Sequence, residues 1–586
     1  MNMLTLFFRF VLCVTLLDST FSLIKYNRNC RNSFNHLISS KRNNYGISTS
    51  IDVAKETKKS NGFLGGFLSI FKRKSDSKSA ENLIPVEVPE RISAEVVIVG
   101  AGMAGLACAK ELVAAGVQNV LLVESSPKAG GRVGTDVVDG YQLDKGFQVF
   151  IDSYPESKKL LDFDRLKLKP FLPGALVRYQ KEFYLVSDPI RRPGDLIPTL
   201  ISPIGSLLDK IKVGVLSIAI RFTALSDVLK IPETNTAEYL SNTLGLSDSI
   251  VDRFFTPFYQ GIFLSPLSEQ SSRMLGFLFK MFTDGAATLP AEGMQAIPDQ
   301  LAADLPVGVS LFNTRVEALT VNNDGTVSIR ATKHAPFSPS AINTTATTAE
   351  RKTLFLDCKN VVIATCPPTA QRLLDSLQIN GSNPSPRDVK ISIPTARSSV
   401  CLYFALKGLP PVTDPILVLN GENKLSSVGD GSTVINNICF PSQVSSLYAP
   451  DGMSLASVTI IGNEKLMAKE SRDGKDVYVL SDDELELSVR SQLAEWWSKE
   501  VTDSWTLLRV YRIPYAQPAQ TPLPYRAISA MTSEDLQSED VIPVQLANNI
   551  YCCGDHRNTA TLNGAIRSGV QVGRAIIKER QLELKK

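Results

Sequence analysis

Residues 94–105 read AEVVIVGAGMAG and decide the fold of this 586-residue chain. Their first half is a continuous apolar run, which is typical of a strand buried in a parallel sheet. Three glycines follow in GxGxxG spacing, and the apolar segment at 106–115 then predicts a helix that ends at Gly116. A strand, a glycine-rich turn and a helix form the first half of a nucleotide-binding βαβ unit.

Each glycine of this turn has a physical role. Gly100 permits the tight turn, Gly102 lets the backbone approach a diphosphate, and Gly105 allows the helix to pack closely on the strand. The diphosphate would lie at the helix N-terminus, beside Ala101 and Ala104, where free N–H groups and the helix dipole favour negative charge. The turn therefore predicts a dinucleotide site.

A second apolar strand is predicted at 120–123 and ends in Glu124, 19 residues after the third glycine. A carboxylate at this place in a βαβ unit accepts hydrogen bonds from a ribose. Six residues later come Gly130, Gly131 and Arg132. The planar guanidinium of an arginine can pair with phosphate oxygens in bidentate fashion. This extension therefore predicts a second contact with the diphosphate.

Together these motifs resemble those of the flavin-containing amine oxidase superfamily, which includes monoamine oxidases, protoporphyrinogen oxidases and phytoene desaturases. The resemblance implies an α/β fold: a Rossmann-like FAD-binding domain of the GR2 type with an inserted mixed α+β substrate domain. It also implies that FAD is the cofactor and that Gly131 and Arg132 contact its diphosphate. Among the branches of the superfamily, the phytoene desaturase and protoporphyrinogen oxidase branch is the most similar.

The resemblance recurs along residues 93–580. The segment DKGFQ at 144–148 resembles the stretch that passes beside the flavin ring, which implies contacts from Gly146 and Phe147. The segment LPAEGMQAIP at 289–298 resembles the block that returns the chain to the FAD domain. Shortly after it, the backbone of Val316 is implied to lie against the adenine.

Near the C-terminus the strand IYCC and the residues Gly-Asp are followed by LNGAIRSG at 562–569. In the superfamily the aspartate holds the ribityl and diphosphate side, and the following helix points its N–H groups at the pyrimidine edge of the flavin. The cofactor contacts implied here are Gly554, Asp555, Gly564 and Ala565. Gly569 and Gly573 are expected to let this helix lie close to the sheet.

The motifs divide the chain into cofactor-binding blocks and insertions. The predicted FAD-binding blocks are 93–155, 285–380 and 541–586. The insertions are a mainly helical substrate or cap region at 156–284 and a substrate-binding domain at 381–540, with strands near 399–404 and a helix near 482–497. The aromatic residues of the first insertion either line a substrate tunnel or form an ordinary helical core: Phe254, Phe255, Phe258, Tyr259, Phe277, Phe279 and Phe282.

Composition narrows the class of protein. The chain is 44% apolar and 21% charged, which excludes a disordered, collagen-like or disulfide-stapled protein. The net charge of +3 is uneven, because residues 1–80 carry 13 Lys/Arg against 4 Asp/Glu, or +9, and the remainder carries −6. The body of the chain therefore gives no electrostatic reason to bind nucleic acid.

The basic excess belongs to a predicted leader and linker at 1–92. Residues 3–17 are apolar and are followed by small residues, as in a signal peptide, and residues 19–51 are basic and free of acids, as in a transit peptide. Such a tandem resembles the bipartite leader of plastids bounded by extra membranes, and a mitochondrial presequence is the alternative. The segment GFLGGFLSIF at 62–71 is either a peripheral membrane contact or part of a flexible linker.

Cysteine and histidine are too sparse and scattered for a structural zinc site. The nine cysteines include no CxxC pair and there are only three histidines. We therefore predict no metal. The apolar surroundings of Cys108, Cys366 and Cys401 predict reduced core thiols.

The catalytic residues are not identified by the sequence, but the reaction class is narrowed. Amine oxidases of the superfamily place a lysine on the strand that aligns with 398–404, and a cage tyrosine where this chain has Thr561; neither is present here. His556 is either catalytic or a structural hydrogen-bonding group, and Arg512 and Tyr515 either face the pocket or belong to the core.

We therefore predict hydride transfer from an apolar, isoprenoid-like small molecule to flavin N5, with a quinone or oxygen as electron acceptor. Three alternatives stay open: an amine or polyamine oxidase, a protoporphyrinogen oxidase-like enzyme, and a flavoprotein that assists assembly without turnover. The sequence leaves the oligomeric state open.

Overall fold

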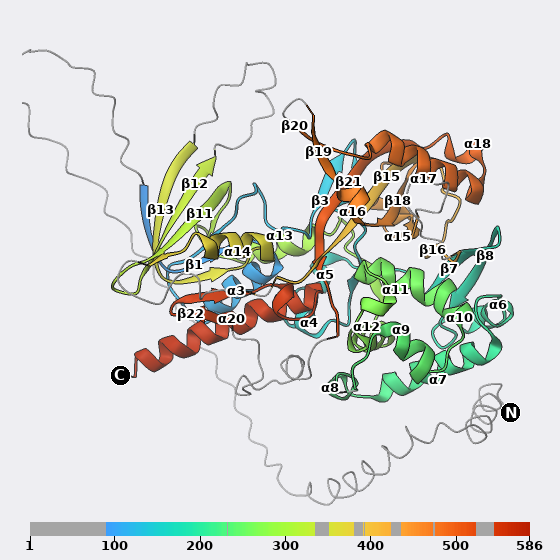
Figure 1. Ribbon diagram of the computed structural model, residues 1–586, viewed down its shortest axis with the longest axis horizontal. Helices are drawn as coiled ribbons and strands as arrows, with labels where there is room; N and C mark the ends of the chain where they lie inside the picture. The colour runs from blue at the N-terminus through green and yellow to red at the C-terminus, as the bar shows by residue number, and fades with distance from the viewer. Residues whose placement is uncertain are drawn as a thin grey trace, which may run out of the picture. The chain divides into compact units, whose positions relative to one another are not determined.

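The computed structural model describes residues 90–230, 232–334, 351–379, 391, 393–422, 435–472, 475–522 and 544–585. All of them belong to one unit, Val88–Lys586 (Figure 1). The predicted leader up to residue 89, its membrane-contact segment and the polar residues 335–350 lie outside the described residues. In the described part, no helix is long and apolar enough to cross a membrane.

The glycine-rich turn belongs to a nine-stranded sheet with β1 (Glu90–Val99) inside it. β1 pairs in parallel with β2 (Val120–Val123) on one side and with β13 (Arg351–Ile363) on the other. The strand order is β10-β2-β1-β13-β12-β11-β14, with β22 and β23 attached to β13. The other members are β10 (Ser310–Leu311), β11 (Thr314–Val321), β12 (Val327–His334), β14 (Gln378–Ile379), β22 (Gln545–Ala547) and β23 (Ile550–Cys552).

The long strand β13 divides this sheet into two parts. Along its first half it pairs antiparallel with β12, and its last three residues pair in parallel with β23. The parallel part, β2-β1-β13-β23, is a Rossmann-like core assembled from the start, middle and end of the chain. The predicted FAD-binding block starts at residue 93, whereas β1 begins at Glu90, because Glu90, Arg91 and Ile92 also pair with β13. Two of these three residues are charged, so the sequence pattern does not indicate a strand there.

Two helices lie side by side next to the parallel strands: α3 (Met103–Ala114) and α20 (Leu562–Glu583) (Figure 1). Gly569 is expected to bring α20 close to the sheet, but the element that α20 approaches there is the helix α3. A Cβ on Gly569 would lie 2.0 Å from the carbonyl oxygen of Ala104, so the glycine allows a close approach to α3. The neighbouring glycine, Gly573, faces the side chain of Glu111 on the same helix.

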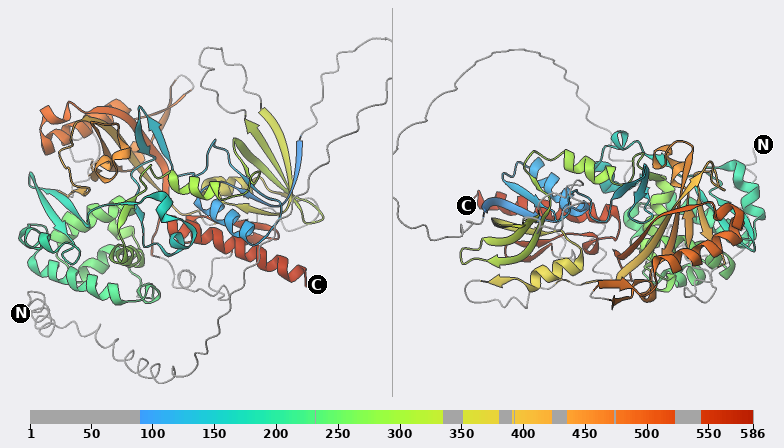
Figure 2. Two further views of the ribbon diagram at one scale, coloured as in Figure 1. Left: turned by 180° about the vertical axis from the view of Figure 1, so that it is seen from behind. Right: turned by 90° about the horizontal axis from the view of Figure 1, so that it is seen from above.

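A second, seven-stranded sheet has the order β21-β15-β18-β17-β16-β7-β8 (Figure 2). The first insertion contributes two of its strands, β7 (Gly174–Tyr179) and β8 (Glu182–Ser187), so this insertion is not helical throughout. β7 joins the sheet through parallel pairing with β16, a contact between segments more than 200 residues apart. The remaining strands are β15 (Ala396–Lys407), β16 (Leu417–Asn420), β17 (Asn437–Cys439), β18 (Met453–Ile461) and β21 (Thr506–Pro518).

Helices cover both faces of the second sheet. On one face, alternate residues of β15 pack with α17 (Asp482–Trp497), which lies where the sequence predicts a helix. Apart from the short strand β6 (Lys169–Pro170), which pairs with β9 (Ala287–Leu289), the rest of the first insertion is mainly helical. Its longer helices are α6 (Leu196–Ile201), α7 (Leu207–Phe222), α11 (Thr256–Phe263) and α12 (Ser272–Asp284). Its aromatic residues stack on one another, for example Phe255 on Tyr259 at 6.1 Å. Phe255, Tyr259 and Phe277 are buried and the other four are half-buried, which favours the helical core over a tunnel lining.

Candidate cofactor-binding site

The glycine-rich turn leaves an open space in front of α3. Gly100 has φ +109°, and a Cβ on Gly105 would lie 2.0 Å from the carbonyl oxygen of Gly100, so both positions need glycine. Gly102 is different, because a Cβ there would meet no atom within 4 Å. It is the N-cap of α3, and no side chain caps the free N–H groups of the first turn. This is the space and the donor set that a diphosphate needs.

The predicted second phosphate contact lies beside this turn. The N–H of Gly130 donates to the carbonyl oxygen of Ala101 at 2.8 Å, and Gly130 and Gly102 form a parallel bridge. Gly131 has φ +61°, and a Cβ there would approach only the Cα of Gly102, at 3.6 Å. Two glycine-rich backbones therefore face one space.

Glu124 is buried at the end of β2 and is fixed by the turn itself. Its Oε2 accepts from the N–H of Ala101 at 2.8 Å, and its Oε1 accepts from the N–H of Ser126 at 2.8 Å and from Ser125 Oγ. The N–H of Ala101 is therefore not free for a phosphate, and Ala104 packs against α20. Oε1 already has two donors, but Oε2 has one and can accept another, so Glu124 can still take a ribose hydroxyl.

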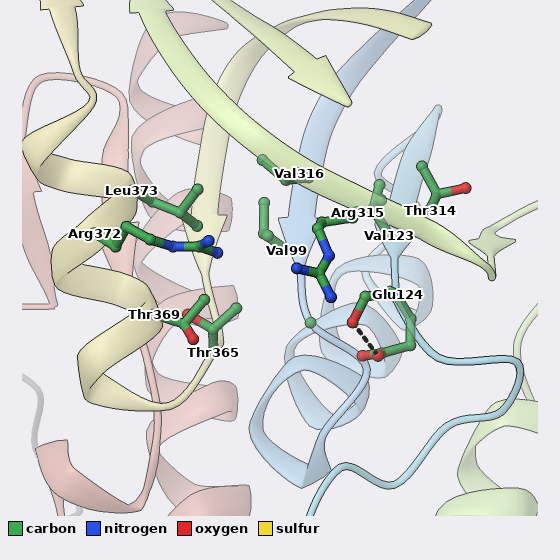
Figure 3. A pocket seen from close by; sticks show the side chains of 12 residues that line it. Val99, Val123, Glu124, Thr314, Arg315, Val316, Thr365, Thr369, Arg372 and Leu373 are labelled. Carbon is green, nitrogen blue, oxygen red and sulfur yellow. Dashed lines mark hydrogen bonds between the residues drawn. The ribbon is translucent and has the colours of Figure 1, made fainter. Parts of the chain in front are cut away.

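A pocket of about 170 Å³ opens beside Glu124 (Figure 3). Val316 of β11 lines it, as the predicted adenine contact should. The other lining residues are Val99, Gly100, Val123, Ser125, Thr314, Arg315, Thr365, Thr369, Arg372 and Leu373. Its place between the glycine-rich turn and β11 suits the adenosine half of a dinucleotide.

Arg132 and Asp555 come together from opposite ends of the chain. Arg132 Nη2 lies 2.7 Å from Asp555 Oδ1, and its Nη1 donates to the carbonyl oxygen of Ala516 at 3.0 Å. The guanidinium also lies over the ring of Tyr515, 5.8 Å from its centroid. Arginine has five N–H donors, so further donors remain for a phosphate. The sequence predicts both residues as cofactor contacts but not their mutual ion pair.

The start of α20 differs from the expectation that Gly564 and Ala565 contact the flavin. The N–H of Gly564 donates to Thr561 Oγ at 3.0 Å, and that of Ala565 donates to the carbonyl oxygen of Thr561. These two N–H groups are therefore used inside the helix and do not point at a flavin. Gly564 is required for packing, since a Cβ there would lie 2.0 Å from the carbonyl oxygen of Thr559. The N–H groups of Leu562 and Asn563 remain outside the helical ladder.

The segment predicted to pass the flavin ring lies against the second sheet. Gly146 has φ +84°, and a Cβ there would meet Ile513 Cδ1 at 2.6 Å and Ser399 Oγ at 3.9 Å. The ring of Phe147 packs edge-on against Phe171, with centroids 6.5 Å apart. The strand that carries the lysine in amine oxidases, β15 here, therefore does pass the predicted flavin segment.

Buried polar atoms without partners mark the same region. Thr365 Oγ1, Tyr515 Oη and His556 Nδ1 are buried and have no hydrogen-bond partner among the residues that the structure describes. Such groups are costly unless a ligand or water satisfies them. Burial lowers the pKa of His556 to about 4, so its ring is neutral at neutral pH and suits a hydrogen bond better than a charge. Gly554 has φ +155°, and a Cβ there would meet the His556 ring. The open cradle, the adenosine pocket and these unpaired groups fit FAD.

A buried network at the edge of the site was not predicted from the sequence. Asp144 Oδ1 accepts from Thr135 Oγ1 at 2.5 Å and from the N–H of Met294 at 3.0 Å, and its Oδ2 accepts from Tyr448 Oη at 2.9 Å. Burial raises the pKa of Asp144 to about 6, although these three hydrogen bonds oppose the rise. The network connects the LPAEGMQAIP segment (289–298) and the DKGFQ segment (144–148) to the loop of the second sheet that carries Tyr448.

Asp144→Asn is expected to remove a pH dependence of stability. A pKa raised in the folded state means that protonation stabilises the fold at low pH and that this contribution is lost between pH 3.8 and about 6. The loss amounts to about 3 kcal/mol. Relative to the variant, the wild type should therefore lose about that much as the pH rises from 4 to 7, measured by urea unfolding. Asp136→Asn, on the neighbouring strand, is the control, and a difference that is constant with pH would contradict the prediction.

Three further predictions concern the thiols, the metal ligands and Arg512. All seven cysteines that the structure describes are free thiols, with Cys108 and Cys401 buried and Cys366 half-buried. Within the described ranges, no group of three or more His, Cys, Asp or Glu side chains could hold a metal ion. Arg512 does not face the pocket: its guanidinium donates to the carbonyl oxygens of Leu466 and Leu480.

Comparisons with known proteins agree with this geometry. A family model described as "Flavin containing amine oxidoreductase" matches residues 103–577. Among solved structures, putrescine oxidase bound to putrescine superposes with a TM-score of 0.55 at 15% identity, over 83% of this chain and 100% of that one. A candidate protoporphyrinogen oxidase from Exiguobacterium sp. 255-15 gives 0.54 at 16% identity, over 84% and 99%. At these identities the likeness shows the fold alone.

A curated relative matches over a shorter stretch. Coproporphyrinogen III oxidase of Propionibacterium freudenreichii subsp. freudenreichii is 31% identical over 195 residues, which is 31% of this chain and 34% of that protein. The chain thus spans about a third of the length of this relative.

Proposed function

Because the chain belongs to the flavin-containing amine oxidoreductase family, we propose that this FAD-dependent oxidoreductase dehydrogenates a small apolar, isoprenoid-like molecule. The observation that carries the proposal is the face of β15 beside Gly146. Between Arg397 and Lys407 at its two ends, that face offers Ser399, Cys401 and Tyr403 and no lysine. A site without a charged side chain in the middle of this strand suits a substrate that needs positioning rather than charge recognition.

The two ionisable groups of this face are neutral. Cys401 and Tyr403 are fully buried, and burial raises the pKa of Cys401 to about 11 and that of Tyr403 well above its usual value. Cys401 Sγ lies 3.2 Å from Ser457 Oγ on the neighbouring strand β18. Because both groups are neutral, neither would abstract a proton from a substrate held beside this strand.

The position of the amine oxidases' cage tyrosine supports the same proposal. Thr561 occupies that position, and its hydroxyl caps the N-terminus of α20 by accepting from the N–H of Gly564. A cage needs ring faces to attract a positively charged nitrogen, and a capping threonine supplies none. We therefore infer that dehydrogenation of an apolar substrate fits this site better than oxidation of an amine.

The chemistry divides between the cofactor and the chain. FAD supplies the two-electron acceptor when it is bound. The chain's residues bind its diphosphate at Gly102 and Gly131, hold its ribose at Glu124, and exclude water through the aromatic core of the first insertion. We propose that a quinone or oxygen reoxidises the enzyme.

A second candidate is oxidation of a porphyrinogen. It is favoured by the 31% identity to a coproporphyrinogen III oxidase, and it is also a removal of hydrogen from a largely apolar macrocycle. The two candidates share the cofactor site and differ only in the substrate that reaches it.

An anaerobic reduction experiment separates the candidates. The FAD-loaded protein is mixed with polyprenoid and carotenoid fractions, with coproporphyrinogen or protoporphyrinogen, and with a polyamine panel, and the loss of the visible band of oxidised flavin is followed. We expect reduction by the polyprenoid arm. Reduction by the porphyrinogens alone selects the second candidate, reduction by polyamines contradicts both, and no reduction in any arm favours a non-catalytic flavoprotein.

We further propose that the protein associates peripherally with a membrane, which would bring it to an apolar substrate. Ile197 and Ile201 on α6 and Leu207, Leu208 and Phe222 on α7 are all exposed, with Phe222 84% exposed. Within the described residues, the one acid of α7, Asp209, is buried and caps the helix, so its exposed charges are basic. Basic amphipathic helices of this kind bind anionic lipid surfaces.

The double variant Leu208→Asp with Phe222→Asp is expected to lower binding to anionic vesicles about tenfold or more, because two apolar side chains lose their insertion. Sedimentation with phosphatidylglycerol vesicles measures the effect. Leu487→Asp, an exposed leucine on α17, is the control. Equal sedimentation of both variants would contradict the proposal.

A further inference from the structure

Two arginines extend into the adenosine pocket from different elements. Arg315 lies on β11 next to Val316, and Arg372 lies on α14 (Pro367–Asp375). Figure 3 shows both guanidinium groups entering the pocket, from opposite sides, with the Glu124 carboxylate below Arg315. Among the residues that the structure describes, neither side chain has a hydrogen-bond or ion-pair partner.

Two unpaired cations in one small pocket select a narrow class of occupant. Like charges repel, so a group between them is stabilising only if it offers negative charge or a π-face. The pocket between them is lined by the apolar side chains Val99, Val123, Val316 and Leu373. Apart from the two arginines and Glu124, the remaining lining residues are uncharged, which suits a flat heteroaromatic ring, and the Glu124 carboxylate would repel a phosphate placed beside it.

We propose that Arg315 and Arg372 hold the adenine ring of FAD between their guanidinium planes. The guanidinium group is planar and stacks on aromatic faces and on bases, whereas the ammonium group of lysine cannot stack. Val316 borders the ring by its backbone and Glu124 takes the ribose, so the arginines supply the contacts to the two ring faces. This role concerns retention of the cofactor and is independent of the substrate.

The consequence is an affinity for FAD that depends on the adenine. An exposed cation–π contact corresponds to about a threefold change in Kd, so Arg315→Ala and Arg372→Ala should each weaken FAD binding about threefold and together about tenfold. Titration of the apoprotein with FAD, followed by flavin fluorescence, measures this change. Where binding is too tight to titrate, the rate of FAD release on dilution replaces it.

Three comparisons make the test specific. ADP, which keeps the adenine, should lose affinity for the double alanine variant by the same factor, whereas FMN, which lacks it, should not. The lysine variants Arg315→Lys and Arg372→Lys, which keep the charge and lose the plane, should recover only part of the lost affinity, because an ammonium group can lie over a ring but cannot stack flat on it. Arg330→Ala, on the neighbouring β12 and paired with Glu317 at the surface, is the matched control and should bind FAD as the wild type does.

The outcomes are decisive. Unchanged FAD and ADP affinity in the double alanine variant overturns the inference, and so does full rescue by lysine, which would show that charge alone matters. An equal loss for FMN also overturns it, because the arginines would then act on the flavin or the phosphate. Thermal unfolding of each apoprotein confirms that the variants are folded. The proposed substrate class is tested separately, by the flavin reduction experiment.

Discussion

Gly102→Val abolishes FAD binding and leaves the apoprotein folded: this is the expected result of filling the space in front of α3. The backbone of Gly102, with φ −74° and ψ 176°, is accessible to any residue, and a Cβ there meets no protein atom within 4 Å. The valine side chain would therefore cost the apoprotein little. It would instead occupy the place of the diphosphate, beside Gly131.

The expected loss of affinity is large. Displacing the diphosphate removes at least two charge-assisted hydrogen bonds to the first turn of α3, each of about 1.5–3 kcal/mol. FAD affinity should therefore fall by about 10² or more. Flavin content after purification and FAD titration of the apoprotein measure the effect, and circular dichroism checks the fold.

Gly194→Val is the matched control for this prediction. A Cβ at Gly194 also meets nothing within 4 Å, but the residue lies at the surface of the first insertion, away from the cradle. This variant should keep its flavin. Normal flavin content in Gly102→Val would show that the cofactor's diphosphate does not lie at this turn.

The cofactor half of the site could be predicted from sequence because its physical requirements are local. Gly100 is required by its own φ of +109°, and Gly105 by its close approach to the Gly100 carbonyl oxygen five positions earlier. Glu124 follows its own strand directly. The ion pair between Arg132 and Asp555 confirms that distant blocks meet, which the resemblance implied.

Other features depend on contacts between distant segments, and sequence patterns do not encode such contacts. The pairing of β7 with β16 moves part of the first insertion into the second sheet, and nothing in its alternation indicates the partner strand. Asp144 looks like part of a flavin motif, and its buried bond to Tyr448 emerges only when two domains pack. Arg372 lies on a helix with no motif, so its entry into the adenosine pocket becomes visible only in three dimensions.

Gly569→Ala is expected to destabilise the fold and to release FAD, although alanine favours helices. The added methyl group would lie 2.0 Å from the carbonyl oxygen of Ala104 and 3.1 Å from the backbone nitrogen of Cys108, so α20 must move away from α3. Backbone atoms cannot rotate aside, and overpacking of this kind costs about 3 kcal/mol, more than the gain of about 1 kcal/mol in helix propensity. Because Ala104 belongs to the first turn of α3, the displacement also disturbs the diphosphate cradle.

Gly573→Ala provides a control of equal chemistry on the same helix. Its methyl group would meet Glu111 Cβ at 3.0 Å and the Cys108 carbonyl oxygen at 3.4 Å, contacts that a shift of a few tenths of an ångström relieves, unlike the 2.0 Å overlap at Gly569. Its unfolding free energy should therefore stay within about 1 kcal/mol of the wild type. Urea unfolding of the apoproteins and flavin content give the two readouts. If both variants were equally stable, the contact between α20 and α3 would not be the close backbone packing that holds the two ends of the cofactor domain together.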